Sequence, residues 1–208
     1  VAKPVTVDEN GPQGFTMKLT DVMGNSETMT AYSDENIMAA TWNTEFMYKV
    51  GESIGEDGLA LGMAGLYGPA MNTHRSPYAG RNFEYYSEDP LLTGKIAAAM
   101  INGVESQGVG TSLKHYAVNN QETNRLANNS ILSERALREI YLKGFEIAVK
   151  EAQPWTIMSS YNYINGEHAS QSYRLLTTIL RDEWGFEGVV MSDWGAGYDP
   201  VAQVSAGN

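Results

Sequence analysis

The sequence contains no cysteine, which excludes disulfide bonds, thiolate metal ligands and a cysteine nucleophile. Histidine is also scarce, and His74, His115 and His168 do not show the H-x-x-H or H-E-x-x-H spacing of a metal site. The phosphate-binding P-loop and the G-x-S-x-G motif of serine hydrolases are both absent. We therefore predict neither a bound metal nor a cofactor.

The sequence also has few positively charged residues. It holds 14 Lys and Arg against 25 Asp and Glu, a formal net charge of −11. Nucleic-acid binding needs clustered basic residues, so a nucleic-acid partner is excluded, and a neutral or cationic substrate is favoured. No window approaches the run of about 18 apolar residues that a membrane-spanning helix needs, and we predict no membrane partner. The composition leaves the cellular compartment open.

The two ends of the sequence lack the features of a complete protein. Residues 1–14 read as loop and have neither the charged nor the apolar region of a signal peptide. Residues 201–208 stop shortly after what looks like the start of a helix. We expect the chain to be an internal fragment of a larger protein.

Helix and strand patterns alternate along most of the chain. Residues 1–32 lack clear periodicity and are expected to be mostly loop. Four helices are predicted at 33–62, 90–107, 133–152 and 173–184, and four short strands at 64–71, 111–117, 156–161 and 188–193. The first helix is predicted from Met38, Trp42, Phe46, Val50 and Ile54, which recur every four residues.

This alternation predicts an α/β fold, in which helices surround a parallel sheet. A doubly wound sheet and a (β/α)₈ barrel both fit the order. The barrel is favoured because no G-x-G-x-x-G turn follows the first strand. A full barrel usually needs about 250 residues, so we predict that residues 1–208 form a single, incomplete TIM-barrel-like domain.

Polar and aromatic residues stand where the predicted strands end. Ligands of parallel α/β proteins bind at the carboxyl ends of the strands, so these residues are expected to share one mouth. They are Asn72, His74, Arg75 and Arg81 after the first strand, Lys114, His115 and Tyr116 at the second, Met158, Tyr161 and Asn162 at the third, and Asp193 and Trp194 at the fourth.

Simpler interpretations stay open for each of them. Arg81 could belong to an ion-pair network of its own loop with Glu84, Glu88 or Asp89. Because neighbouring strand residues point to opposite faces, either Lys114 or His115 could belong to the core. Tyr161 could be a buried tyrosine, and Asp193 a helix cap with Trp194 as packing.

A carboxylate among cationic and aromatic side chains suits a neutral, polyhydroxylated substrate. Polar groups would bind hydroxyls, while aromatic faces cover the apolar side of a sugar ring. Asp193 would then be a nucleophile or would stabilise an oxocarbenium-like transition state. We expect Arg81, Lys114 and His115 to keep it ionised.

Four segments resemble glycoside hydrolase family 3, most closely its β-glucosidase branch. They are NTHRSPYAGRNFEYYSEDP (72–90), KHYAVNNQETNR (114–125), MSSYNYING (158–166) and LRDEWGFEGVVMSDWGA (180–196). The resemblance implies a retaining enzyme in which a (β/α)₈-type barrel precedes an α/β sandwich domain, here absent from the chain.

The resemblance also implies a role for each site residue. Asp193 is the expected nucleophile, and Arg81, Lys114 and His115 are expected to hold hydroxyls of the terminal sugar. The remaining expectations are Tyr161 beside the nucleophile, Met158 and Trp194 as walls of the sugar sites, and Arg125 in a supporting shell.

Two departures from the family pattern stand out. Asn10 occupies the position where an Asp that grips sugar hydroxyls is expected, and an amide lacks the charge of that Asp. The general acid/base of the branch comes from the sandwich domain, so we expect it from outside this chain. Glu122 is the nearest internal candidate by motif and is interpreted as structural.

We therefore predict hydrolysis of terminal, non-reducing β-D-glucosyl residues from a β-glucoside or an oligosaccharide. The β-N-acetylhexosaminidase branch is disfavoured, because the Pro-Gly-rich stretch and the Asp-His pair after Lys114-His115 are lacking. A β-xylosidase or arabinofuranosidase stays open, as does a carbohydrate-binding fragment without catalytic activity.

Overall fold

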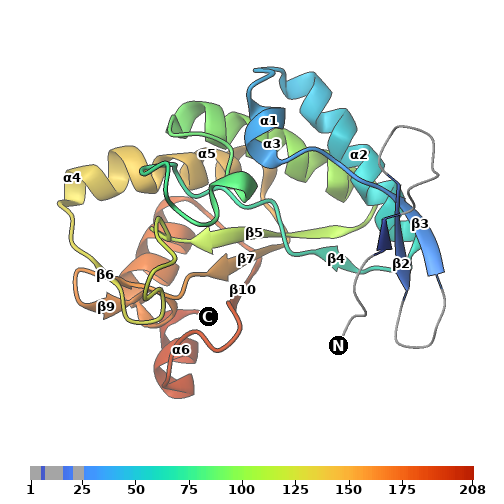
Figure 1. Cartoon of the computed structure of the whole chain (residues 1–208). Coiled ribbons are helices and arrows are strands. Elements are labelled where there is room, and N and C mark those ends of the chain that lie inside the picture. The colour runs from blue at the N-terminus through green and yellow to red at the C-terminus, as the bar shows by residue number, and fades with distance from the viewer. Residues whose placement is uncertain (1–5, 8–15, 21–25) are drawn as a thin grey trace.

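The centre of the molecule is a sheet of four parallel strands, shown in the computed structural model (Figure 1). The structure describes residues 6–7, 16–20 and 26–208. The strand order is β10-β7-β5-β4. The bounds are β4 (Gly65–Leu66), β5 (Gly110–Tyr116), β7 (Thr156–Ser159) and β10 (Val189–Ser192). All four predicted strands are present and parallel, as expected.

Helices connect these strands and cover the sheet. In Figure 1, the helices above the sheet run alongside its strands, which is the outer layer of a barrel. The helices are α1 (Glu35–Ala39), α2 (Thr44–Ala60), α3 (Pro90–Ser106), α4 (Glu134–Ala136), α5 (Lys143–Ala152) and α6 (Pro200–Ala206), with the π-helical segments η2 (Leu137–Tyr141) and η4 (Arg174–Glu183). The fold is an incomplete (β/α) barrel, and this prediction is confirmed. Among the described residues, no helix combines the length and apolar character that crossing a membrane requires.

The predicted helix starts are confirmed by their caps. The carboxylate of Asp89 accepts a hydrogen bond from the backbone N–H of Leu91 at 2.7 Å, and Pro90 occupies the first helical position of α3. The hydroxyl of Ser133 accepts from the N–H of Ala136 at 3.2 Å. Both side chains satisfy N–H groups that have no partner inside the helix.

The first predicted helix is wrong as a single element. Trp42 adopts a left-handed backbone conformation with φ of 54°, which ends one helical segment, and the side chain of Asn43 caps α2 at the N–H of Phe46. Trp42 is 71% exposed and Phe46 44%, so these two members of the predicted stripe do not face the core, whereas Met38, Val50 and Ile54 do.

The fully buried face of α2 consists of one large residue, Met47, and a row of glycines. Met47, Gly51 and Gly55 are buried on it. A Cβ atom added at Gly103 of α3 would lie 2.2 Å from the carbonyl oxygen of Tyr48, so the two helix backbones are in direct contact. Large apolar residues alone could not reveal this face, because glycine is what permits the approach.

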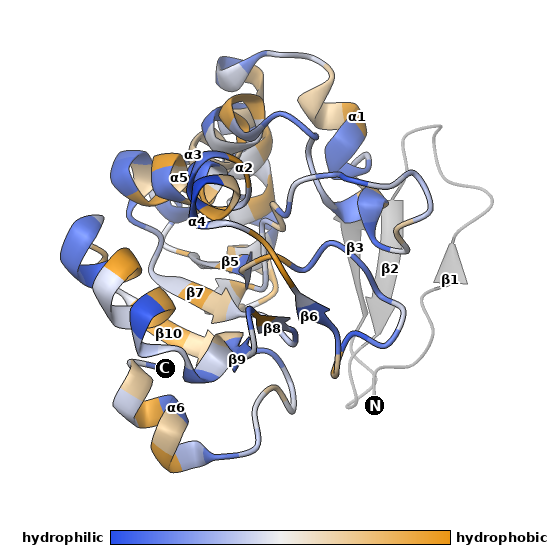
Figure 2. Cartoon of the chain, turned by 90° about the vertical axis from the view of Figure 1, so that its left-hand side faces the viewer, coloured by the Kyte–Doolittle hydropathy of each residue, from blue (hydrophilic) through white to orange (hydrophobic). Residues whose placement is uncertain are grey.

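The prediction of loop for residues 1–32 is wrong in part. Strands β1 (Thr6–Val7), β2 (Thr16–Thr20) and β3 (Ser26–Thr30) form an antiparallel sheet. The sequence of β2 alternates polar residues with Met17 and Leu19, the period of a strand. A third small sheet, β6 (Asn129–Ser130), β8 (Tyr163–Ile164) and β9 (Glu167–His168), joins two loops beside β7 and β10 (Figure 2).

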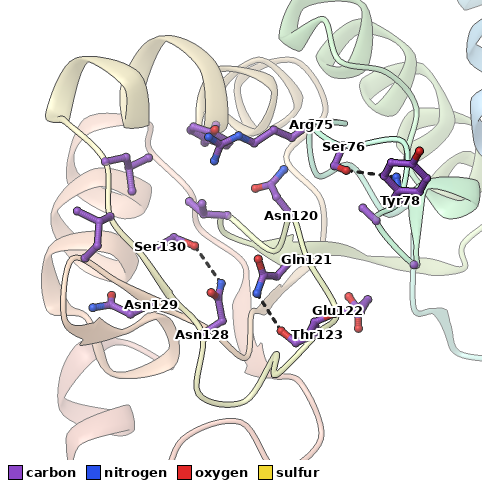
Figure 3. Close-up of a pocket in the computed structure, with 16 residues that line it drawn as sticks. Arg75, Ser76, Tyr78, Asn120, Gln121, Glu122, Thr123, Asn128, Asn129 and Ser130 are labelled. Atoms are coloured by element: carbon purple, nitrogen blue, oxygen red, sulfur yellow. Dashed lines mark hydrogen bonds between the residues drawn. The ribbon is translucent and has the colours of Figure 1, made fainter.

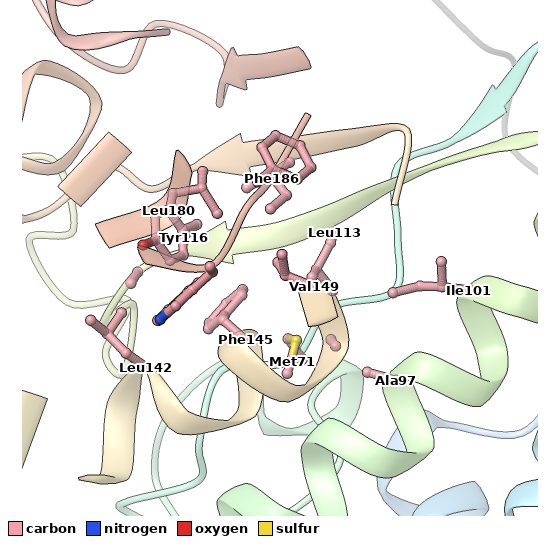
Figure 4. Close-up of a cluster of buried hydrophobic side chains, with 14 of the residues drawn as sticks. Met71, Ala97, Ile101, Leu113, Tyr116, Leu142, Phe145, Val149, Leu180 and Phe186 are labelled. Carbon is pink, nitrogen blue, oxygen red and sulfur yellow. The ribbon is translucent and has the colours of Figure 1, made fainter. Parts of the chain in front are cut away.

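The main core lies between the sheet and its helices (Figure 4). The ring of Tyr116, at the end of β5, meets the ring of Phe145 edge to face at 5.3 Å, and its hydroxyl donates to the carbonyl of Leu175 at 3.1 Å. The end of β5 is thereby fixed in position. Val190 of β10 is buried, but Val189, also expected in the core, is 62% exposed. The two side chains point to opposite faces, and β10 is the edge strand of the described sheet.

Candidate active site

A cavity of about 180 Å³ lies at the carboxyl ends of the parallel strands. Its lining is Tyr67, Arg81, Lys114, His115, Arg125, Met158, Tyr161, Asp193 and Trp194. Eight of these nine residues, all except Tyr67, were predicted from the sequence as site residues. One further predicted site residue, Asn10, lies outside the described residues.

Asp193 reaches this cavity because it directly follows strand β10. Its N–H donates to the carbonyl of Ser159 at 3.0 Å, which extends the pairing of β10 with β7. The N–H of Trp194 donates to Oδ1 of Asp193 at 2.8 Å, and Oδ2 lies 3.6 Å from Nε2 of His115. The side chain is nearly buried, so one carboxylate oxygen is fixed by the backbone while the other faces the histidine.

Lys114 and His115 both line the cavity, although neighbouring strand residues normally point to opposite faces. The pairing of β5 with β7 is irregular at this point: Lys114 pairs with Met158, and the next pair joins Tyr116 to Ser159. One residue of β5 is therefore left over, as in a β-bulge, which redirects side chains. The alternative that one of the two residues belongs to the core is wrong.

His115 is an uncharged member of the site. Burial is the main cause that lowers its pKa well below the ordinary value, and the positive charges of Arg81 and Lys114 act in the same direction. The expectation that His115 acts as a cation beside Asp193 is therefore wrong.

The surroundings of the two ring nitrogens of His115 favour one of its neutral tautomers. The hydroxyl oxygen of Tyr85 accepts from Nδ2 of Asn119 at 3.1 Å and lies 3.2 Å from Nδ1 of His115, so its own proton can be donated to Nδ1. An ionised carboxylate only accepts, and Oδ2 of Asp193 lies 3.6 Å from Nε2, which favours the tautomer with the proton on Nε2. That N–H group faces the carboxylate of Asp193.

Arg81 and Lys114 share one carboxylate. Nε of Arg81 binds Oε1 of Glu84, and Nζ of Lys114 lies 3.3 Å from Oε2 of the same side chain. The loop ion pair considered for Arg81 is therefore present, and Arg81 lines the cavity as well. Glu84 had no predicted role in the site.

Arg125 and Tyr161 form another side of the cavity. The guanidinium carbon of Arg125 lies 4.6 Å from the centre of the Tyr161 ring, a cation–π distance. The Tyr161 hydroxyl donates to the carbonyl of Trp194 at 2.8 Å. Burial, and then the negative charge of Asp193, raise the pKa of Tyr161. Glu122 lies 3.0 Å from Nη1 of Arg125 and accepts from Asn119 at 3.1 Å, so it is engaged within the loop network.

The rim of the cavity is aromatic. The rings of Tyr67 and Trp194 meet at 88° with their centres 5.8 Å apart, and Trp194 is 72% exposed. Tyr67 was missed, although it directly follows strand β4 and the rule of strand ends would have found it. Met158 is buried beside them.

Asp193 is the one carboxylate among the described lining residues. A retaining glycosidase uses two carboxyl groups about 5–5.5 Å apart. Across residues 6–7, 16–20 and 26–208, no cluster of three metal-ligating side chains exists either. The cavity thus offers a carboxylate, cationic and neutral hydrogen-bond donors, and three aromatic rings.

A larger open cavity of about 650 Å³ lies between the loops around residues 75–80 and 118–132 (Figure 3). Its lining is rich in amides and hydroxyls, including Asn120, Gln121 and Asn128. Glu122 also lines the larger cavity. It is ion-paired with Arg81 and Arg125, which line the smaller cavity, so these ion pairs lie between the two cavities. Of the residues expected at the ends of the strands, Arg75 lines this larger cavity and not the smaller one.

Comparison with known proteins bears on this geometry. Residues 18–203 match the family described as "Glycosyl hydrolase family 3 N terminal domain". The chain is 49% identical over 203 residues to an exo-α-(1→6)-L-arabinopyranosidase of Bifidobacterium longum, covering 95% of the chain and 27% of the relative. It is 51% identical over 179 residues to β-glucosidase A of Butyrivibrio fibrisolvens, covering 86% and 22%.

Solved structures agree with the sequence relatives. β-Glucosidase 3B of Thermotoga neapolitana, in complex with α-D-glucose, superimposes with a TM-score of 0.88 at 52% identity, covering 96% of this chain and 28% of that protein. The chain spans about a quarter of the length of the relatives it matches.

Proposed function

The chain belongs to glycosyl hydrolase family 3, and from that premise we propose that it forms the nucleophile-bearing part of a retaining glycosidase acting on terminal β-D-glucosyl residues. The observation that carries the proposal is the cavity itself, in which a nearly buried Asp193 lies opposite cationic donors and beside exposed aromatic rings. The names of several relatives as β-glucosidases support the choice of sugar.

In the first step, Oδ2 of Asp193 attacks the anomeric carbon. A carbon–oxygen bond to the carboxylate forms while the bond to the leaving oxygen breaks, and an acid protonates that oxygen. Oδ1 is already bound by the N–H of Trp194, so the carboxylate presents Oδ2. In the second step, water attacks the same carbon, gives its proton to the same group acting as base, and releases Asp193.

The surrounding side chains supply binding and orientation. Arg81 and Lys114 are placed to donate to hydroxyls of the sugar, and the Nε2–H group of His115 is placed to donate to a hydroxyl or to Asp193. Tyr67 and Trp194 offer ring faces to the apolar side of a sugar. Bound hydroxyls fix the anomeric carbon relative to Asp193, which is how positioning lowers a barrier.

The acid/base group comes, in this proposal, from outside the 208 residues. The described lining contains no second carboxylate, and Glu122 is engaged with Arg125 and Asn119. We expect the 208-residue chain alone to release little or no 4-nitrophenol from 4-nitrophenyl β-D-glucoside. Rapid turnover by this chain would place the acid/base within it.

The test of the nucleophile uses a chain extended to the full length of the relatives. Treatment with a 2-deoxy-2-fluoro-β-D-glucoside traps the covalent intermediate, and mass spectrometry should find the label on the peptide that contains Asp193. Asp193→Asn should abolish both labelling and turnover. Asp199→Asn is the matched control, because Asp199 caps α6 outside the cavity. A label on another peptide, or normal turnover by Asp193→Asn, would refute the assignment.

A second candidate is favoured by the arabinopyranosidase relative. An α-L-arabinopyranoside lacks the sugar-6 group of a β-D-glucoside and also carries its 4-hydroxyl in the opposite orientation, so contacts at these two positions decide between the two sugars. Comparing kcat/KM for the 4-nitrophenyl α-L-arabinopyranoside and β-D-glucoside in the extended chain distinguishes the candidates. A higher kcat/KM for the arabinoside would replace the first proposal.

A further inference from the structure

Glu84 occupies a special place between the two cations of the cavity. It lies in the 3₁₀ turn η1 (Asn82–Glu84), within the loop that follows strand β4. Its side chain is 17% exposed, and its two carboxylate oxygens have different partners. One binds Nε of Arg81 from the same turn, and the other lies 3.3 Å from Nζ of Lys114 on strand β5.

We propose that Glu84 is a positioning residue for sugar binding: its carboxylate holds Arg81 and Lys114 side by side with their remaining donors directed into the cavity. This inference rests on the proposed function, because it assigns those donors to a sugar. Glu84 itself does not line the cavity and is not expected to touch the substrate.

The contacts of Arg81 and Lys114 with Glu84 leave donor groups of both cations free. Arg81 is bound through Nε, so its two terminal amino groups are not consumed by Glu84, and Nη1 lies 3.9 Å from Glu122. Lys114 uses one of its three donors at Glu84. Each cation can therefore be fixed by Glu84 and still donate to a hydroxyl.

The charges require an anion at this place. The side chains of Arg81 and Lys114 are 20% and 16% exposed, so water screens their repulsion only in part. The neighbouring carboxyl, Glu35, cannot take over this task. Burial raises the pKa of Glu35 well above its ordinary value, and its Oε1 accepts from the N–H of Ala70 at 3.3 Å. Glu84 is left to carry the negative charge between the two cations.

Long cationic side chains also lose much rotamer freedom when they bind a ligand. A carboxylate that restricts both of them beforehand lowers that cost, which is the general benefit of preorganisation. Removing the charge of Glu84 should therefore weaken sugar binding without changing any group that touches the sugar.

The test measures binding of D-glucose by titration calorimetry, which needs no catalytic turnover, in the chain extended to the full length of the relatives. Glu84→Gln keeps the size of the side chain and removes its charge, and we expect the affinity to fall about tenfold or more. Glu84→Asp keeps the charge on a shorter side chain and should lose less. Glu88→Gln is the matched control on the same loop, where the side chain is exposed, and should bind as the unchanged chain does.

A double-mutant cycle separates positioning from a general structural effect. In the background of Lys114→Met, Glu84→Gln should weaken glucose binding much less than it does alone, because one of the two cations it orients is gone. Equal losses in both backgrounds, or unchanged affinity in Glu84→Gln, would overturn the inference.

A second readout needs no sugar and separates this inference from the proposed function. The Nε–H proton of Arg81, bound to Glu84, should exchange slowly with water in NMR spectra, and Glu84→Gln should accelerate that exchange while Glu88→Gln does not. If the extended chain fails to bind glucose, the proposed function fails, and the exchange of this proton still decides whether Glu84 holds Arg81. Fast exchange in the unchanged chain would refute the inference.

Discussion

The side chain of Asn72 is expected to be a main determinant of stability around the site. It is 2% exposed, and it makes two hydrogen bonds with the backbone of one residue, His115. Nδ2 donates to the carbonyl oxygen of His115 at 2.9 Å, and Oδ1 accepts from the N–H of His115 at 3.0 Å. These backbone groups lie where the pairing of β5 with β7 is irregular, so the sheet does not replace the bonds.

Asn72→Ala would leave a buried N–H and a buried C=O without partners. An unsatisfied buried polar group costs about 1–3 kcal/mol, and partial entry of water into the space of the lost amide reduces the sum for two groups. We expect Asn72→Ala to lower the free energy of unfolding by about 2–4 kcal/mol. Asn72→Asp should also destabilise the chain, and more at high pH, because an ionised carboxylate oxygen would face the carbonyl of His115.

The assay is urea unfolding followed by tryptophan fluorescence, with linear extrapolation to water. The matched control is Asn82→Ala, since Nδ2 of Asn82 makes a single bond, to the carbonyl of Ser76 at 2.7 Å, on the exposed loop. That control should lose less than about 1 kcal/mol. Equal losses in the two variants would refute the claim that Asn72 satisfies buried backbone groups of β5.

Three further outcomes follow from packing and titration. Gly103→Ala should lower the free energy of unfolding by about 1–3 kcal/mol, because its Cβ would overlap the carbonyl of Tyr48, despite the roughly 1 kcal/mol that alanine gains in a helix. Gly58→Ala, whose Cβ would meet only the side chain of Val109 at 3.3 Å, should lose less in the same urea experiment. Burial raises the pKa of Glu35, so above pH 4.5 the folded chain binds a proton that the unfolded chain has lost, and stability falls as the pH rises toward the folded pKa. Glu35→Gln should remove that loss, measured in melting curves at a series of pH values. Burial lowers the pKa of His115, so stability should fall as the pH drops below 6.5, and His115→Gln should reduce that fall.

The parts of the fold that follow from local patterns were predictable. Pro90 directly after Asp89, and the cap at Ser133, specify the starts of two helices to within a few residues. Short apolar runs specify the four strands. The break at Trp42 was not predictable from periodicity, because a left-handed residue and the cap at Asn43 interrupt an otherwise continuous pattern. Contact between α2 and α3 through Gly103 has no apolar signature at all.

The candidate site likewise has residues that the sequence could place and contacts that it could not reveal. Side chains that directly follow strands, such as Asp193 and Lys114, can be placed from the sequence, because the ends of parallel strands meet at one edge. The end of the first predicted strand places Asn72 near the mouth, but the sequence reveals neither its bonds to the backbone of His115 nor a role for Glu84 in the site. Their partners, His115 and Lys114, lie 43 and 30 residues away, and only the folded loop after β4 brings them together.

The distribution of charge around the cavity explains why Asp193 suits covalent chemistry better than an ion pair. Lys114 is within ion-pair distance of Glu84, and the ring closest to Asp193 is a histidine kept neutral by burial. The carboxylate therefore has a backbone N–H on one oxygen and an uncharged N–H donor opposite the other. A carboxylate bound tightly to a guanidinium would have to break that contact before it could attack carbon, whereas Asp193 is oriented without one. Arg81 and Lys114 are instead in contact with Glu84, and in our proposal their remaining donors bind the hydroxyls of a substrate.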